Sequence, residues 1–295
     1  MASAAPASTA SRPRLAVAVG DPRGIGPEVV RKALRQPLDA DVRIVGGWED
    51  GTPSEVEAGR VAAQTIEAAA RLALSGEADA IVTGPVNKSA LHAAGYRFPG
   101  ITEFLAHVAG DIPVAMMLTT GRLRVVLVTT HLSLRDAIAS VTTDRVVEAG
   151  RIATDALQQW WGINTPRLAL CALNPHAGEG GLFGDEDERL LRPAAAALDA
   201  AGPLPADTVF VRALRGEFDA VLAPYHDVGM TAVKVSGFGT GVNVTLGLPF
   251  IRTSPDHGTA FDIAGKGIAD AGSMRASLEL AVQLTNARQA KAVRA

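Results

Sequence analysis

Three histidines occupy the same sequence context, each shortly after an apolar run with the length of a β-strand. They are His131, His176 and His226. Ligands bind beyond the carboxyl ends of strands in α/β sheets, so imidazoles at this edge can converge from distant parts of the sequence. Neutral imidazole binds Zn²⁺, Mn²⁺, Co²⁺ and Fe²⁺. One such histidine alone would commonly be a capping or core residue, but the shared context of three favours a metal site. His92 and His107 lie in helical patterns and are interpreted as surface or packing residues.

Two glycine-containing segments can bring backbone N–H groups close to a ligand. The run Asn174 to Gly181 places three glycines beside His176, which permits a close backbone approach or simply forms a flexible turn. The run Gly20 to Glu28 lies between an expected strand and an expected helix, where exposed N–H groups can bind an anion. It matches neither the Rossmann nor the Walker glycine pattern, so it predicts no nucleotide fold of those types.

A third cluster contains the side chains that bind phosphate or carboxylate. After Tyr225-His226-Asp227 come Lys234, Asn243, Arg252, Asp256 and His257. Lysine and arginine both pair with such anions, and arginine can do so through two parallel hydrogen bonds. Each cation alone would more commonly be a solvated surface charge, so the cluster rather than either residue indicates an anion site.

The elements that must position these residues follow an α/β rhythm. The apolar runs expected to form strands are 15–19, 42–45, 80–83, 115–118, 123–128, 168–172 and 220–223, and the helical patterns are 52–75, 143–160 and 185–201. The first of these helices is expected to start at a capping box formed by Thr52-Pro53-Ser54-Glu55. The runs 115–118 and 123–128 are close enough to form a hairpin, which adds antiparallel pairing to a mostly parallel sheet. We expect two lobes that share a cleft.

Composition limits the classes of protein that remain. The chain has 295 residues, of which 47% are hydrophobic and 20% charged, which predicts a soluble globular protein. A net charge of −3 argues against a nucleic-acid binder, and no apolar stretch is long enough to cross a membrane. A single cysteine, Cys171, excludes an internal disulfide and fits a cytoplasmic location. Residues 1–14 are interpreted as a disordered tail before a two-lobed unit over residues 15–295.

Several motifs, in their order along the chain, resemble one known family. They are Gly20-Asp21-Pro22, Gly26-Pro27-Glu28, Thr83-Gly84-Pro85-Val86-Asn87-Lys88, His131-Leu132-Ser133-Leu134-Arg135-Asp136, Leu173-Asn174-Pro175-His176-Ala177-Gly178-Glu179-Gly180-Gly181, Tyr225-His226-Asp227 and the run 242–265. Together they are similar to the 4-hydroxythreonine-4-phosphate dehydrogenase family, which serves vitamin B6 synthesis and has relatives acting on four-carbon sugar-acid phosphates. The similarity covers nearly the whole chain after the first residues.

The resemblance implies an isocitrate- and isopropylmalate-dehydrogenase-like fold, a homodimer with its active site at the subunit interface, and NAD as cofactor. It also implies a divalent metal, Zn²⁺, Mn²⁺, Co²⁺ or Mg²⁺, held by the three histidines already singled out. The implied substrate contacts are Thr102, Lys234, Asn243 and Arg252, and the candidates for proton transfer are Asp207 and Lys88, whose order stays open.

Departures from the family pattern bear on the substrate. Family members usually read Gly-His-Thr-Glu where this chain has an isoleucine, Ile101, and Val228 replaces a common glutamine. The segment between the strand at 42–45 and the helix that follows is also shorter than usual. The expected function is NAD- and metal-dependent oxidation, with decarboxylation, of a phosphorylated 3-hydroxy acid such as 4-hydroxythreonine 4-phosphate, threonate 4-phosphate or erythronate 4-phosphate. The alternatives are a dihydrodiol carboxylate dehydrogenase, a non-catalytic binder of a phosphorylated metabolite and a metal-dependent hydrolase.

Overall fold

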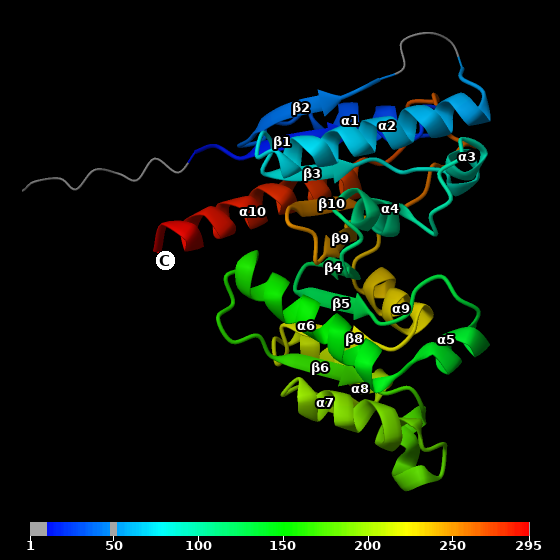
Figure 1. Ribbon diagram of the computed structural model, residues 1–295, viewed down its shortest axis with the longest axis vertical. Helices are drawn as coiled ribbons and strands as arrows, with labels where there is room; N and C mark the ends of the chain where they lie inside the picture. The colour runs from blue at the N-terminus through cyan, green and yellow to red at the C-terminus, as the bar shows by residue number, and fades with distance from the viewer. Residues whose placement is uncertain (1–10, 48–51, 295) are drawn as a thin grey trace, which may run out of the picture.

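One mixed β-sheet runs through the whole computed structural model, which describes residues 11–47 and 52–294 (Figure 1). The strand order among these residues is β2-β1-β3-β10-β9-β4-β5-β8-β6-β7. The strands are β1 (Arg14–Ala18), β2 (Asp41–Val45), β3 (Ala80–Thr83), β4 (Ala115–Thr120), β5 (Leu123–Leu127), β6 (Leu168–Cys171), β7 (Ala201–Leu204), β8 (Ala220–Ala223), β9 (Val242–Leu246) and β10 (Ile251–Pro255). The α-helices are α1 (Gly26–Ala33), α2 (Glu55–Leu74), α3 (Lys88–Ala93), α4 (Ile101–Val108), α5 (Leu134–Ser140), α6 (Thr143–Gln159), α7 (Arg192–Ala197), α8 (Ala206–Leu214), α9 (His226–Ser236) and α10 (Gly272–Arg294).

The sheet consists of two parallel sets joined by an antiparallel centre. Strands β2, β1, β3 and β10 are parallel in one lobe, and β5, β8, β6 and β7 are parallel in the other. Between them, β9 is antiparallel to β10 and β4, and β4 is antiparallel to β5. Because sheets twist, the two sets turn so that the arrowheads of β2, β5 and β6 point to the same side (Figure 1). The carboxyl ends of the parallel strands in both lobes therefore lie on the same side of the molecule, near α3, α4, α5 and α9.

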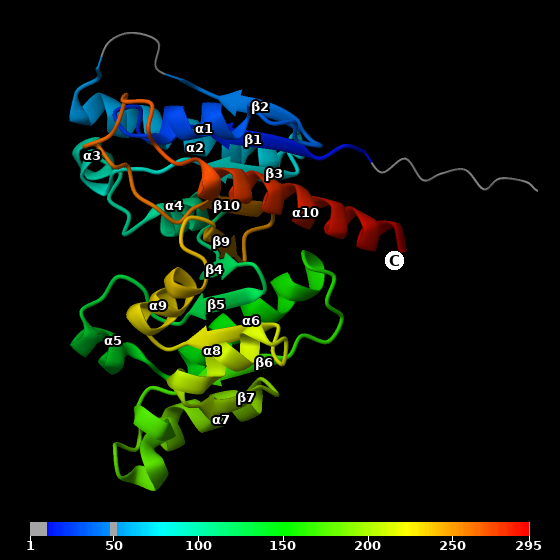
Figure 2. The ribbon, with the colours of Figure 1, turned by 180° about the vertical axis from the view of Figure 1, so that it is seen from behind.

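Apolar side chains cover both faces of the sheet, as one continuous core on one face and as two separate cores on the other. In β1, Leu15 and Val17 point to one core and Ala16 and Ala18 to another, as the two-residue period of a strand requires. The first core extends across both lobes beneath α1, α10, α6 and α7. Figure 2 shows α1 and α10 on the face opposite to α2. The other face carries two separate cores, one beneath α2 and α4 and one beneath α8 and α9. The space between these two cores is where the sheet can receive a ligand.

Most predicted elements are confirmed. β3 and β8 have the predicted bounds, and β4 and β5 form the predicted hairpin. β1 begins at Arg14, which the sequence placed in the tail, while residues 1–10 of that tail lie outside the described residues.

The single helix predicted over 185–201 is wrong. A π-helical turn over Asp187–Leu191 leads into α7, and residues 201–204 form β7 instead. β7 lies at the edge of the sheet, where Pro203 costs no ladder hydrogen bond.

The capping box of α2 lies two residues later than predicted. Ser54, not Thr52, is the N-cap: its hydroxyl accepts a hydrogen bond from the Glu57 backbone N–H at 3.3 Å, and the Glu57 carboxylate accepts one from the Ser54 N–H at 2.9 Å. The two bonds satisfy donors that a helix start otherwise leaves unpaired.

We predict that Ser54→Ala lowers the free energy of unfolding by about 1 kcal/mol, the usual cost of removing an N-cap hydroxyl. Thr52→Ala serves as the matched control, because it removes a hydroxyl two residues away that makes no cap, and it should change stability by less than about 0.5 kcal/mol. Urea denaturation of both variants checks the assignment. A larger loss of stability in Thr52→Ala than in Ser54→Ala would mean that Thr52 is the N-cap, as predicted from the sequence.

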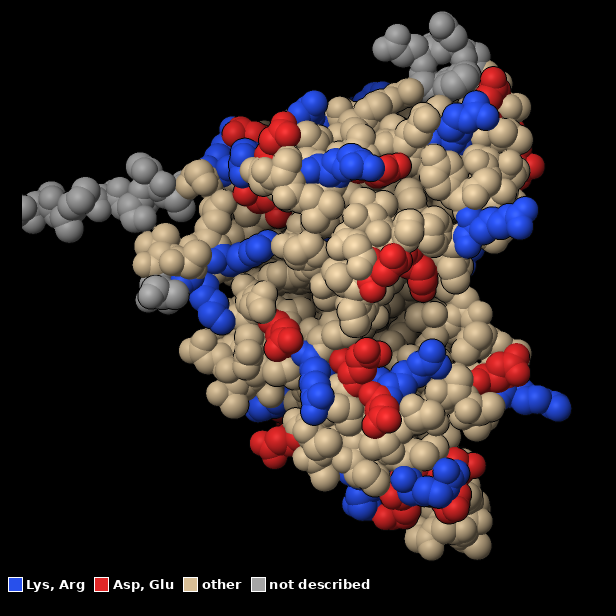
Figure 3. Space-filling view, in the orientation of Figure 1, with Lys and Arg blue, Asp and Glu red and all other residues tan. Residues whose placement is uncertain are grey.

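Charged side chains are mixed over the surface. On the face drawn in Figure 3, lysine and arginine alternate with aspartate and glutamate among the described residues, as the nearly balanced charge requires. Within the same part of the chain, no helix combines the length and apolar composition that crossing a bilayer demands.

Candidate active site

A cleft with a volume of about 350 Å³ lies between the two lobes, near α3, α4 and α9. Its walls come from both lobes and include most of the side chains predicted to bind substrate. The lining residues that matter here are Lys88, Ile101, Thr102, Met116, Leu118, His131, His226, Met230, Asn243, Arg252, Ser254 and His257. A space of this size suits a small, polar ligand.

The pairing of the three central strands sets the chemistry of the cleft floor. Two rows of side chains cross β10, β9 and β4 on the same face: Arg252, Thr245 and Met116 in one, Ser254, Asn243 and Leu118 in the other. Alternate residues of these strands point to the opposite core, as Val244 and Met117 do. The polarity of the cleft floor therefore decreases from β10, which carries a cation and a hydroxyl, to β4, which carries apolar side chains.

Arg252 is a buried cation without an ion-pair partner among the described residues, although the negative charge of Glu103 acts on it from beyond ion-pair distance. It is 4% exposed, and its guanidinium donates to the Thr83 hydroxyl from Nη2 at 2.7 Å and to the Thr245 hydroxyl from Nη1 at 3.0 Å. No carboxylate among the described residues forms an ion pair with it. Burial lowers the pKa of Arg252 to about 10, so the side chain is still charged at neutral pH. A buried charge without a partner is costly, and an anionic ligand would supply the missing partner.

Two other polar atoms of the cleft also lack partners. Asn243 Oδ1 and His257 Nε2 are buried, and neither has a hydrogen-bond partner within the described residues. His257 Nδ1 lies 3.0 Å from the Gly258 carbonyl oxygen, so Nδ1 carries the proton and Nε2 presents a lone pair. Buried polar atoms are normally paired, so these two atoms are available to hydrogen-bond a ligand in the cleft.

His131 and His226 meet because they follow neighbouring parallel strands, β5 and β8. Their ring centroids are 5.6 Å apart. Burial, with the charges of Lys88 and His226, lowers the pKa of His131, which favours the neutral imidazole that metals bind. His226 Nδ1 lies 2.7 Å from the Asp227 carboxylate, which accepts the Nδ1 proton. Nε2 is then the ring nitrogen that can bind a metal ion. The donor set thus fits a divalent cation, with room for more ligands.

Three predicted site residues do not line the cleft of a single chain. His176 lies in a left-handed turn after β6, where residues 176–180 all have positive φ. The described residues contain no group of three or more metal-binding side chains, so His176 does not join His131 and His226 within one chain. Asp207 lies on α8 and lines another hollow. Lys234 does not line the cleft; its ammonium donates to the carboxylate of Asp256, a residue that does, at 2.5 Å.

The second hollow, with a volume of about 630 Å³, runs between α8 and α9. Its walls are mainly apolar, and Val235 on its rim is 83% exposed. Helix α9 borders both spaces, with His226 and Met230 toward the cleft and Val228 and Ala232 toward this groove. A molecule that covered the groove would contact the helix that carries His226.

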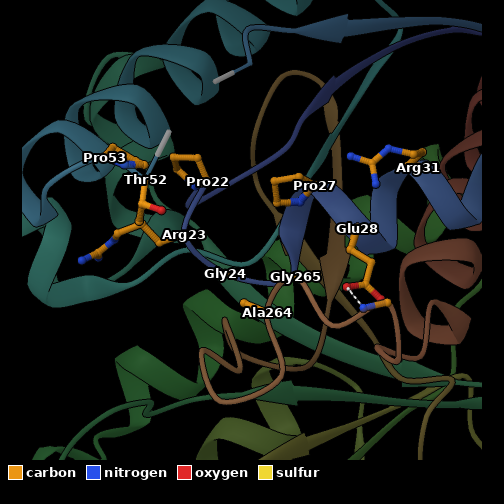
Figure 4. Close-up of a pocket in the computed structure, with 11 residues that line it drawn as sticks. Pro22, Arg23, Gly24, Pro27, Glu28, Arg31, Thr52, Pro53, Ala264 and Gly265 are labelled. Atoms are coloured by element: carbon orange, nitrogen blue, oxygen red, sulfur yellow. Dashed lines mark hydrogen bonds between the residues drawn. The ribbon is translucent and has the colours of Figure 1, made fainter. Parts of the chain in front are cut away.

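A third pocket, of about 370 Å³, lies beside the glycine-containing loop before α1 (Figure 4). Arg23, Pro27 and Glu28 line it from that loop and α1, opposite the segment 264–267. The same loop touches the cleft wall, since the Asp21 N–H donates to the Pro85 carbonyl at 2.9 Å. The loop therefore contacts both the cleft wall and this pocket.

Sequence reasoning did not single out the apolar and hydroxyl side chains of the cleft floor, Met116, Leu118, Thr245 and Ser254. The alternation of side chains along each strand shows which residues share a face of that strand. Only the pairing of β9 with both β10 and β4 places these four on one face of the sheet.

Comparison with known proteins identifies the family. Residues 26–281 match the family described as "Pyridoxal phosphate biosynthetic protein PdxA". The chain belongs to the PdxA family. A 4-hydroxythreonine-4-phosphate dehydrogenase of Beijerinckia indica is 44% identical over 92% of this chain and 94% of its own length. A D-threonate 4-phosphate dehydrogenase of Cupriavidus necator is 42% identical, over 94% of this chain and 98% of its own.

Solved structures agree with this membership. The crystal structure of a 4-hydroxythreonine-4-phosphate dehydrogenase from Klebsiella pneumoniae has a TM-score of 0.82 and 39% identity, and the match covers 94% of this chain and 99% of that one. An isocitrate dehydrogenase from Methylococcus capsulatus, 16% identical with a TM-score of 0.50 over 96% of this chain and 88% of its own, shares the fold. The predicted α/β fold and the predicted family are confirmed, and this PdxA-family protein is a dehydrogenase.

Proposed function

We propose that this chain oxidises and decarboxylates a four-carbon 3-hydroxy acid phosphorylated at carbon 4, with NAD as the oxidant. The names of its relatives make 4-hydroxythreonine 4-phosphate and threonate 4-phosphate the first candidates, with erythronate 4-phosphate beside them. The observation that carries the proposal is the buried Arg252, a cation in the wall of a small cleft without an ion-pair partner among the described residues. A phosphate there gains charge-assisted hydrogen bonds and relieves the cost of the buried charge.

The remaining polar groups hold the rest of the substrate. Asn243 adds an amide to the lining of the cleft, and Lys88 adds an ammonium. Holding the phosphate fixes the position of carbon 3 relative to the histidines, and such positioning contributes strongly to rate. Lys234 reaches the phosphate only if it leaves Asp256 or is shared with it.

His131 and His226 are the residues that would hold a divalent metal ion in this chain. Asp227 orients the His226 ring through its Nδ1 proton, as carboxylates do for many metal-binding histidines. A metal ion bound there would lower the pKa of the substrate hydroxyl and stabilise the negative charge that remains when CO₂ leaves. Lys88 lies near enough to His131 to lower its pKa, so this ammonium is well placed to move a proton at the reacting carbons.

A second copy of the chain completes the site in this proposal. His176 and Asp207 do not reach the cleft of their own chain, and the apolar groove between α8 and α9 borders the helix that carries His226. A homodimer that covers the groove would bring residues of one copy to the cleft of the other. The partner's His176 would then be the third metal ligand, and the partner's Asp207 a second group for proton transfer.

NAD is proposed to extend from the cleft toward the pocket beside the loop before α1. The loop lines this pocket and contacts the cleft wall at Pro85, and the Ile25 N–H ties the loop to the Thr259 carbonyl at 2.9 Å. Gly24 allows this contact, because a Cβ there would meet the Thr259 carbonyl oxygen at 2.7 Å. NAD bound there would supply the two-electron oxidant that the reaction needs, as the acceptor of hydride from carbon 3.

The experiment that tests the function is NADH formation by chelator-treated protein after single additions of Zn²⁺, Mn²⁺, Co²⁺ or Mg²⁺. The substrates are 4-hydroxythreonine 4-phosphate, threonate 4-phosphate, erythronate 4-phosphate, 3-hydroxy-4-phosphooxybutanoate, their dephosphorylated forms and a cyclic cis-diol acid. We expect metal-dependent NADH and CO₂ from phosphorylated acids only. Faster turnover of the cyclic diol acid would favour a dihydrodiol dehydrogenase, and binding of the acids without any NADH would favour a non-catalytic binder. Release of phosphate without NADH would indicate a hydrolase.

A further inference from the structure

Four apolar side chains line one part of the cleft. Ile101 begins α4 and faces the same space as Met116 and Leu118 of β4 and Met230 of α9. The opposite end of the floor carries Arg252. The ligand must therefore place a charged group at one end and a part without hydrogen-bonding groups at the other.

Two threonine hydroxyls lie near these apolar side chains, and both make contacts within the protein. Thr102 follows Ile101 and is buried, and its hydroxyl lies 3.4 Å from that of Thr245. The Thr245 hydroxyl in turn accepts a hydrogen bond from Arg252. Thr245 thus holds the arginine, Thr102 contacts Thr245, and the start of α4 presents the aliphatic Ile101 side chain.

Given the proposed function, carbon 2 is the part of the substrate left to meet this apolar end. The phosphate binds Arg252, the hydroxyl of carbon 3 meets the histidines, and the carboxylate is the group that departs as CO₂. In a four-carbon acid, only the substituent on carbon 2 is then free to vary. An amino or hydroxyl group there would lose water and gain no partner from Ile101, Met116 or Leu118.

We propose that Ile101 is a specificity-determining residue that selects 4-phosphorylated 3-hydroxy acids with hydrogen or a methyl group on carbon 2 over those with an amino or hydroxyl group. This inference rests on the proposed function and narrows its substrate class. An apolar pocket discriminates against an added polar group by roughly ten- to a hundredfold in kcat/KM.

The test compares three acids that differ only at carbon 2: 3-hydroxy-4-phosphooxybutanoate, threonate 4-phosphate and 4-hydroxythreonine 4-phosphate. The full-length, metal-loaded protein is assayed for NADH formation, and the affinity for each acid is measured by calorimetry without NAD. The expected result is a kcat/KM about tenfold or more higher, and a tighter Kd, for the acid with hydrogen on carbon 2. An equal or higher kcat/KM, with equal or tighter binding, for the acids with a polar carbon 2 would overturn the inference.

Two variants separate polarity from size. Ile101→His should reverse the preference by giving the carbon 2 substituent a hydrogen-bonding partner, and Ile101→Val, which stays apolar, should keep it. An unchanged ratio in Ile101→His, with a melting temperature like that of the parent protein, would overturn the role of Ile101. If no acid yields NADH, the proposed function fails, while the calorimetric order of affinities still decides whether the cleft prefers an apolar carbon 2.

Discussion

Arg252→Met should lower kcat/KM by about two to three orders of magnitude while leaving the fold at least as stable. Removing one partner of a buried, charge-assisted contact costs about 2–5 kcal/mol of binding, and each 1.4 kcal/mol is worth about a factor of ten. The free protein gains from the same change, because it no longer buries a cation whose hydrogen-bond partners within the described residues are two neutral hydroxyls, those of Thr83 and Thr245. Steady-state kinetics and urea denaturation of the same preparation measure both effects.

Arg71→Met is the control for this experiment. Arg71 is an exposed residue of α2 that pairs with Glu67 one turn away, so its loss should change neither activity nor stability by a measurable amount. Arg252→Lys should retain part of the activity, since lysine keeps the charge but cannot donate to two hydroxyls and a phosphate at once. Activity of Arg252→Met within tenfold of the parent protein, with the same KM, would mean that the phosphate does not bind this guanidinium.

Arg252 also shows what the sequence could and could not predict. Its residue type, together with Lys234 and Asn243, predicted an anion site. Its burial and its lack of an ion-pair partner among the described residues depend on the pairing of β10 with β9, which turns Arg252 to the cleft face beside Thr245. No apolar run predicted that pairing, because the antiparallel centre is formed by contacts distant in sequence, and propensities describe only local preferences. β7 was missed for a related reason: Ala201–Leu204 has no β-branched or aromatic residue, and its neighbour β6 determines its conformation.

The histidines show the same limit at the site. The rule that ligands gather at strand ends selected three of them, and two converge because β5 and β8 are parallel neighbours. β6 is also a neighbour of β8, yet His176 does not join them, since the chain turns in a left-handed conformation at residues 176–180. The end of a strand can be inferred from an apolar run. The direction of the chain beyond that end depends on backbone angles, and the glycines after His176 were the only sign in the sequence that these angles are unusual. A residue contributed by a second copy cannot be inferred from the pattern of one chain.

A heterodimer of two inactive variants should recover about half of the parent activity. His226→Ala and His176→Ala are each expected to lower metal content and to reduce kcat by about 10²-fold or more, because each removes one proposed metal ligand from both sites of the homodimer. Co-expression with two different tags, followed by purification through both, gives dimers with one chain of each kind. One site then lacks both histidines, and the other combines an intact His226 with the partner's intact His176.

His107→Ala provides the matched control, because His107 is an exposed histidine of α4 whose Nδ1 lies 2.8 Å from the Asp111 carboxylate, outside the cleft. It should keep the metal content and activity of the parent protein alone and in mixed dimers. If all three histidines belonged to a site within one chain, each chain of the heterodimer would carry a lesion and no activity would return. Metal analysis gives an independent measure: one equivalent per heterodimer against two per parent dimer is expected, and none would refute the shared site.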